Sequence, residues 1–152
     1  MKTLADDGCK ADIVRRLRTL RPESSRRWGR LSAHQMVCHL SDGFRMATGA
    51  TPVRSAKGPL PPTVLKWIAL YLPLRWRAGI PTSPEIDQEC DGTRPAGFAA
   101  DVAGLEQLIE VITTRETAVE CPRHPLFGRM SGADWLRWAY LHADHHLRQF
   151  GA

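Results

Sequence analysis

The sequence lacks the features of secreted, membrane-spanning and disordered proteins. Its four cysteines lie roughly 30 to 50 residues apart with no close pair, which suits neither a zinc ribbon nor a disulfide framework, so we expect reduced thiols. Residues 1–10 contain charged side chains and no apolar core, so we expect no signal peptide. The longest apolar stretch, 64–76, contains Lys66, Pro73 and Arg75, whereas a span needs about 20 apolar residues. We therefore expect a cytoplasmic protein without a transmembrane span.

Alternating apolar and polar residues, the pattern of a half-buried strand, are also missing. There is no Gly-rich phosphate loop with its lysine and no Ser-His-Asp order, which makes nucleotide-driven chemistry and serine hydrolysis improbable functions. The composition, with 43% hydrophobic and 24% charged residues, is that of a globular protein. A length of 152 residues predicts one domain over residues 1–152.

Apolar residues recur at helical spacing along most of the chain. This periodicity predicts helices over 9–20, 32–48, 63–78, 98–115 and 132–150, the third of them interrupted near Pro73. Ser32 with Gln35, and Ser131 with Asp134, have the spacing of capping boxes at the starts of two of these helices. We therefore predict an all-α fold, a four-helix bundle with an additional helix in the middle connection.

Three of the six histidines lie in the last predicted helix. His142 and His146 are about 40° apart around its axis and face the apolar side, whereas His145 lies on the flank. The Cβ atoms of an i, i+4 pair are about 5 to 6 Å apart, so both imidazoles can bind one metal ion. Trp135 and Trp138 lie on the same side and are expected in the wall of the cavity or in the core.

His39, on the helix 32–48, borders the apolar face, and Gly43 one turn later would leave space beside it. Burying three imidazoles costs free energy unless their nitrogens find partners, and a divalent metal is one such partner. Three histidine ligands would leave coordination positions open, as in a catalytic site. The alternative is that these are hydrogen-bonded core histidines. His34 is expected on the polar face and His124 in a loop.

Three segments together resemble a known family: HQMVCHLSDGFRMA, HPLFGRMSGADW and LHADHHLRQF. They are similar to the DinB-like superfamily, whose His-x-x-His-His-x-x-Gln pattern matches His142, His145, His146 and Gln149, although Arg148 stands where many members have glycine. The resemblance implies a four-helix bundle that holds zinc, nickel or iron. The implied ligands are His39, His142 and His146. We expect His145, Gln149 and Asp42 at the rim or supporting the ligands.

The leading functional hypothesis is a metal-dependent enzyme that transfers a low-molecular-weight thiol, such as mycothiol, bacillithiol or glutathione, to a small electrophilic substrate. A metal-bound hydroxide that performs hydrolysis is one alternative, and a non-catalytic, metal-binding or self-associating bundle is another. Asp42 and Glu85 are candidate acid-base groups. Arg45 and Arg148 are candidates for binding the carboxylates of a thiol cofactor.

Two further partners follow from charge and apolar surface. The net charge is +5, and 17 of the 21 basic residues are arginines, seven of them between Arg15 and Arg30. This cluster permits a nucleic-acid partner, but no aromatic stacking motif or recognition helix accompanies it, so this function ranks last. The apolar helix 63–78 favours a homodimer, with contacts from Trp67, Leu70, Tyr71 and Trp76, and association with a membrane surface is the alternative.

Overall fold

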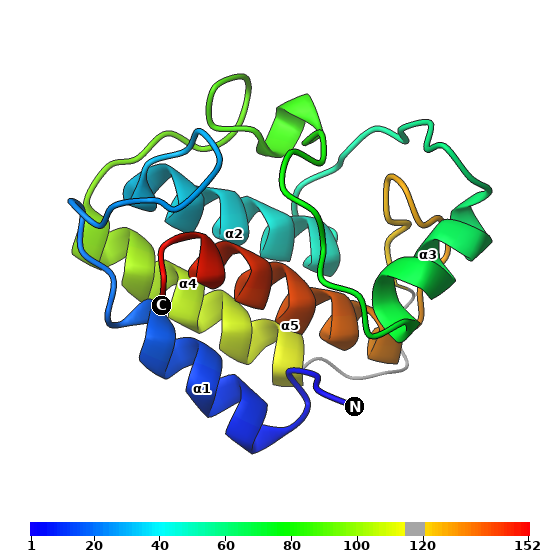
Figure 1. Ribbon diagram of the computed structural model, residues 1–152, viewed down its shortest axis with the longest axis horizontal. Helices are drawn as coiled ribbons and strands as arrows, with labels where there is room; N and C mark the ends of the chain where they lie inside the picture. Colours follow the sequence, from blue (N-terminus) through cyan, green and yellow to red (C-terminus); the bar gives the residue numbers. More distant parts are fainter. Residues whose placement is uncertain (115–120) are drawn as a thin grey trace.

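The computed structural model describes residues 1–114 and 121–152, and these are all-helical (Figure 1). The α-helices are α1 (Asp7–Leu17), α2 (Ala33–Thr48), α3 (Pro62–Tyr71), α4 (Phe98–Thr114) and α5 (Gly132–Gln149), with one 3-10 turn, η1 (Pro84–Ile86). The only β feature in these ranges is an isolated bridge between His124 and Gly128. The all-α prediction is confirmed.

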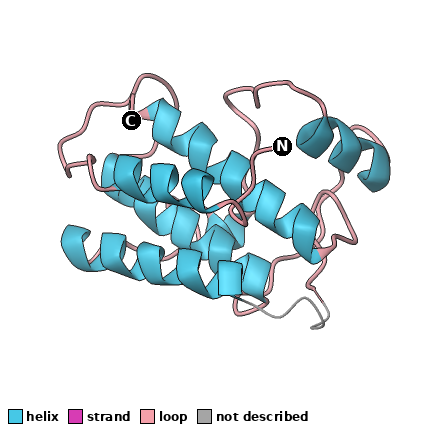
Figure 2. Ribbon diagram, turned by 90° about the horizontal axis from the view of Figure 1, so that it is seen from below, coloured by secondary structure: helices cyan, strands magenta, loops and turns pink. Residues whose placement is uncertain are grey.

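Four helices form a closed bundle: α2 packs against α4 and α5, and α1 packs against the same two helices from the other side. Phe44 of α2, Leu105 and Ile109 of α4 and Leu147 of α5 are almost completely buried in the core between them. Helix α3 packs on α5 outside the bundle, and Figures 1 and 2 both show it at one end of the molecule. None of the helices in the described ranges is long and apolar enough to cross a membrane.

Both helices that carry the clustered histidines begin where the capping boxes predict. Ser32 Oγ accepts a hydrogen bond from the amide of Gln35 at 3.2 Å, and the Ser32 amide donates to Gln35 Oε1 at 2.9 Å. Ser131 and Asp134 make the equivalent pair of bonds at 3.1 and 2.9 Å. Each box satisfies amides that the first helical turn leaves without partners, so it fixes the start of its helix.

Two helices have bounds that differ by more than one residue from the prediction. Helix α1 begins earlier than residue 9, because Asp6 caps it by accepting from the Cys9 amide at 2.8 Å, and it ends at Leu17 rather than at residue 20. The prediction that the third helix continues to residue 78 is wrong, because α3 ends at Tyr71. Leu72 precedes a proline and is extended, with φ −80° and ψ 146°, as the clash with a following proline ring demands. Residue 115, the predicted end of the fourth helix, lies outside the described residues.

His124 is buried in the loop before α5, as the sequence predicted for its place in the chain. Its ring stacks on Phe127 at 4.2 Å between centroids and lies 5.5 Å from each of Trp135 and Trp138. Nδ1 accepts hydrogen bonds from the amides of Leu126 and Phe127, both at 3.2 Å, so the ring must be neutral at that atom. Burial lowers the pKa of His124 to about 3.

We therefore expect His124 to weaken the fold as the solution becomes acidic. Its pKa is lower in the folded chain than the ordinary 6.5, so at acidic pH the unfolded chain binds a proton at this ring and the folded chain does not. The free energy of unfolding therefore falls as the pH drops below 6.5. In His124→Asn an amide oxygen can replace the Nδ1 acceptor without titrating. The loss of unfolding free energy between pH 7 and pH 5, measured by urea denaturation, should be about 2 kcal/mol smaller in the variant. Equal losses in both proteins would contradict this assignment.

Candidate metal centre

His39, His142 and His146 meet between α2 and α5. One nitrogen from each ring lies within 4.8 Å of the corresponding nitrogens of the other two. His39 Nε2 and His142 Nε2 are 3.1 Å apart, and the three ring centroids are separated by 4.7 to 5.0 Å. His39 and His142 are buried, whereas His146 is partly exposed. The three side chains that were predicted as ligands from the sequence therefore form one cluster that can hold a metal ion.

The rings of this cluster are neutral near pH 7. Burial lowers the pKa of His39, and it lowers the pKa values of His142 and His146 well below their ordinary value. Repulsion among the rings adds to the effect, since charge on one ring disfavours charge on the next. Neutral imidazole is the form that binds a metal, because one nitrogen then keeps its lone pair.

Two of the three rings have their tautomer fixed by an acceptor outside the cluster. His39 Nδ1 donates to the carbonyl oxygen of Ile86 at 2.8 Å, and His146 Nδ1 donates to Gln149 Oε1 at 3.0 Å. Since these acceptors demand the proton on Nδ1, the lone pair of each ring is on Nε2, which points into the cluster. Metal-binding histidines characteristically donate their other N–H to a carbonyl or carboxylate in this way. His142 Nδ1, in contrast, is buried without a hydrogen-bond partner.

Asp42 lies one turn beyond His39 on α2 and is buried. Its carboxylate accepts from the Gln88 side chain at 2.8 Å and from the Thr93 amide and hydroxyl at 2.8 and 2.7 Å. These bonds tie the segment after η1 to α2, and Ile86, the last residue of η1, supplies the acceptor for His39. Asp42 thus supports a ligand through the backbone of this segment and not through a bond to an imidazole.

Gln149 is buried at the end of α5 and bridges two parts of the site. While its Oε1 accepts from His146, its Nε2 donates to the carbonyl oxygen of Trp28 at 2.7 Å. Gly29 makes this approach possible: it has φ +82°, and a Cβ atom there would lie 2.1 Å from Gln149 Nε2. Residues 27–29 are therefore held against the same side chain that orients His146.

Gly43 fulfils the expectation that a missing side chain leaves space for a histidine. A Cβ atom at this position would lie 3.0 Å from His142 Cε1 and 3.2 Å from both His142 Nδ1 and Trp138. These distances are shorter than ordinary carbon contacts, so a larger residue would displace the His142 ring. Trp138 covers that ring, with 4.5 Å between centroids.

His145 lies beside the cluster and is not part of it. Its ring stands between Trp28 and Trp76, with 6.2 Å between centroids on each side, and its Nδ1 is buried without a hydrogen-bond partner. Trp76 also lies 6.2 Å from His142. It reaches this place because the chain turns back after Pro73, and its Nε1 donates to the carbonyl oxygen of Ala69 at 2.9 Å. Trp28, Trp76 and the Ile86 carbonyl have no sequence signal that could have placed them here.

Trp135, in contrast, packs in the core. Among the described residues, its ring makes no aromatic contact with the rings of the three histidines. It lies 5.2 Å from Trp138 and 5.5 Å from His124, and its Nε1 donates to the carbonyl oxygen of Pro122 at 3.2 Å. Of the two tryptophans expected as cavity wall or core, Trp138 therefore lines the histidine cluster and Trp135 belongs to the core.

A second group of ligating side chains, His34, Cys38 and Asp101, lies where α2 meets the start of α4. His34 Nε2 donates to Asp101 Oδ2 at 2.6 Å, and the same oxygen accepts from the amides of Ala96 and Gly97. Burial raises the pKa of Cys38 to about 11, so its thiol keeps its proton. These hydrogen bonds explain the group without a metal, because they fix the start of α4 against α2. His34 was predicted on the polar face of its helix, but its side chain is only partly exposed.

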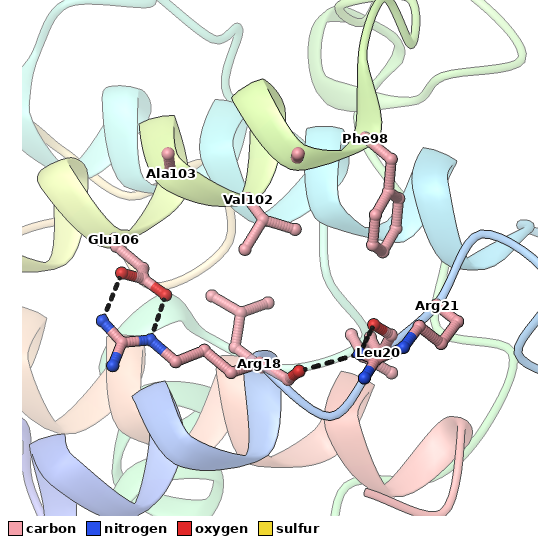
Figure 3. Close-up of a pocket in the computed structure, with 9 residues that line it drawn as sticks. Arg18, Leu20, Arg21, Phe98, Val102, Ala103 and Glu106 are labelled. Atoms are coloured by element: carbon pink, nitrogen blue, oxygen red, sulfur yellow. Dashed lines mark hydrogen bonds and ion pairs between the residues drawn. The ribbon is translucent and has the colours of Figure 1, made fainter.

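The arginines of the N-terminal cluster are largely engaged within the chain. Figure 3 shows Arg18 beside a shallow groove of about 350 Å³ between α1 and α4, where it binds both carboxylate oxygens of Glu106 at 2.8 Å. Arg16 bonds to Asp144 at 2.8 Å, and Arg30 pairs with Asp87 and Glu89. Glu85, one of the candidate acid-base groups, pairs with Arg54 at 2.7 Å. This cluster therefore serves largely to join helices and loops.

A second groove, of about 390 Å³, has in its wall Trp76, whose ring lies 6.2 Å from that of His142. Basic side chains gather around it, from Lys2, Arg75, Arg137 and Arg148, with Asp144 as its one acidic lining residue. Arg148 bonds to Asp144 at 2.9 Å, and Arg45, the other arginine singled out, bonds to Asp42 at 2.9 Å. An anionic group can therefore bind next to the aromatic wall of the site.

Comparison with known proteins gives one match. Neither the curated proteins nor the solved structures contain a significant one, and nothing found here tests the resemblance to the DinB-like superfamily, which stays a prediction. A family model described as "Protein of unknown function (DUF1569)" matches residues 7–152. Because this match covers all but the first six residues, the chain belongs to the DUF1569 family.

Proposed function

We propose that this protein is a metal-dependent enzyme that transfers a low-molecular-weight thiol to a small electrophile. The observation that carries the proposal is the convergence of three neutral imidazoles, two of which have Nε2 fixed as the free nitrogen by Ile86 and Gln149. Three nitrogen ligands suit zinc, nickel or iron, and affinity alone does not choose among them. On the residues quoted from the sequence, we also propose membership of the DinB-like superfamily.

Three neutral ligands leave a divalent ion its full positive charge, and what the metal supplies when bound is stabilisation of the thiol as thiolate, the reactive nucleophile. In the proposed reaction a sulfur–carbon bond forms, and the proton lost by the thiol goes to the electrophile or accompanies its leaving group. His39, His142 and His146 would hold the ion, while the faces of Trp76 and Trp138 would exclude water and favour an uncharged organic electrophile.

The groove beside Trp76 suits the rest of the thiol cofactor. Arg75 and Arg148 line this groove and can bind carboxylates, and the Trp76 ring that separates it from His142 is 6.2 Å from the imidazole. The alternative, hydrolysis by metal-bound hydroxide, would use the same three ligands, since a metal ion lowers the pKa of bound water without a separate base. The groove beside Trp76 favours thiol transfer, because its basic lining offers a place for the anionic part of a thiol cofactor.

Metal binding tests the ligand set directly. We expect protein purified without a polyhistidine tag to contain one divalent transition-metal ion per chain, as measured by elemental analysis. His146→Ala should lose the ion because it removes one of three converging nitrogens. His145→Ala is the matched control, since its ring lies outside the group, and it should keep affinity within about tenfold of wild type in a metal titration. Equal losses in the two variants would contradict the ligand set.

Activity tests the chemistry. Glutathione, bacillithiol and mycothiol are to be assayed against a panel of small electrophiles with wild type, His142→Ala and a variant in which all four cysteines are serine. The loss of metal-held charge should lower the rate of His142→Ala by about 100-fold or more. The cysteine-free variant should keep its rate, because the histidine group contains no thiol.

Each outcome of this assay bears on the proposal. Activity that survives in His142→Ala, or that disappears with the cysteines, would contradict the metal-thiolate mechanism. Ester or amide hydrolysis that depends on the same histidines, without thiol transfer, would replace it with the hydrolase.

A further inference from the structure

Exposed apolar side chains gather at one end of the molecule. The described residues include eight large hydrophobic side chains that are exposed, and six of them lie between residues 60 and 80: Leu60, Val64, Trp67, Tyr71, Leu74 and Ile80. On α3, Val64, Trp67 and Tyr71 are spaced by three and four residues and share its outer face. Leu70 of the same helix, in contrast, is completely buried.

The same stretch has no negative charge. No aspartate or glutamate occurs between Asp42 and Glu85, although the chain has 16 acidic residues, and six lysines and arginines fall within this interval. Lys57, Arg75 and Arg77 are exposed, and none of them has an ion pair among the described residues. The apolar face of α3 is thus flanked by uncompensated positive charge.

The segment that packs beside α3 adds to this charge. Residues 121–133 are joined to it by the bond from the Ala56 amide to the Pro125 carbonyl, at 3.1 Å, and from Lys66 Nζ to the Arg129 carbonyl, at 3.2 Å. Arg123 and Arg129 are exposed, and this segment contains no acidic residue.

The carboxylates nearest to this end are neutralised by partners. Asp134 is buried and bonds to Lys66 at 3.0 Å and to the Tyr71 hydroxyl, and Glu85 pairs with Arg54 at 2.7 Å. The first acidic residue of α5, on which α3 packs, is thus already bound to residues of α3. The net charge of this end of the molecule is therefore positive.

We propose that α3 and its flanking segments, residues 57–80 with 121–133, form a docking surface for an anionic lipid bilayer. Tryptophan and tyrosine beside an aliphatic residue on one helix face, flanked by lysine and arginine, are the combination that places a helix in the headgroup layer. The basic residues attract anionic headgroups, and the apolar side chains enter the boundary with the acyl chains. With ten residues, α3 lies on the bilayer and does not span it.

A second copy of the chain is the other occupant for this face, as the predicted homodimer would require. In a symmetric dimer the same patch meets itself, so two cationic surfaces would face each other without a carboxylate to pair with. Like charges brought together in this way disfavour the contact. Charge complementarity therefore selects the anionic bilayer.

Vesicle co-sedimentation tests the proposal. Wild-type protein is to be mixed with vesicles of phosphatidylcholine alone and with vesicles of equal parts phosphatidylcholine and phosphatidylglycerol. We expect binding to the anionic vesicles at least about tenfold tighter than to the neutral ones, with a decrease as salt screens the charges.

Matched variants distinguish vesicle binding through this surface from non-specific adsorption. Trp67→Ser with Leu74→Ser should abolish binding, whereas Val111→Ser, which removes an equally exposed apolar side chain from α4, should leave it unchanged. Arg75→Gln with Arg77→Gln should weaken binding to anionic vesicles, whereas Arg94→Gln, an exposed arginine outside the surface, should not. These side chains are exposed, so unfolding temperatures should stay close to that of wild type.

Three results would overturn the proposal. The first is that wild type binds neither kind of vesicle, and the second is that the surface variants and their controls bind alike. In the third result, light scattering finds a dimer in solution that Trp67→Ser with Leu74→Ser converts to monomer while vesicle binding is absent, which assigns the face to a second copy.

Discussion

The contact between α2 and α5 depends on how three imidazoles, two of them buried and one partly exposed, satisfy their nitrogens. Each ring brings two polar atoms into an interior otherwise filled by apolar side chains, and an unpartnered polar atom there costs free energy. His39 and His146 meet the requirement at Nδ1 through a carbonyl and an amide oxygen, and in doing so direct Nε2 toward the third ring. Two of the three outer nitrogens of the histidine cluster are therefore held by acceptors outside it, and only His142 Nδ1 lacks such a partner among the described residues.

The helices supply the rings, but loops supply their orientation. The acceptor for His39 is on η1, and Asp42 secures the segment that follows it by bonds to Gln88 and Thr93. The acceptor for His146 is the Gln149 side chain, which is itself bonded to the carbonyl of Trp28. The segment around residue 28 precedes α2 and the segment around residue 86 follows it, and both lie at the site. A buried polar side chain fixes each of them, Gln149 the first and Asp42 the second.

Helical periodicity and capping chemistry explain why much of this could be predicted from the sequence. The four-residue spacing of His142 and His146 places both rings on the apolar side of one helix, and Ser32 and Ser131 mark where the two site helices begin. The Ile86 carbonyl and the rings of Trp28 and Trp76 could not be predicted, because backbone groups leave no residue signature and the two tryptophans approach through loops. The end of α3 at Tyr71 could have been predicted from the sequence, because Pro73 disfavours a helical backbone conformation at Leu72.

The dependence of the imidazoles on loop acceptors separates two properties that are often measured as one. Helix content depends on the core of the bundle, where Phe44, Leu105 and Leu147 are buried away from the loops. The direction of each Nε2 depends instead on a turn at Ile86 and on a carbonyl at Trp28. A chain can therefore have a native far-ultraviolet circular dichroism spectrum and a cooperative unfolding transition although the Nε2 atoms of the three histidines no longer converge on one point. Intact secondary structure is then no measure of an intact site.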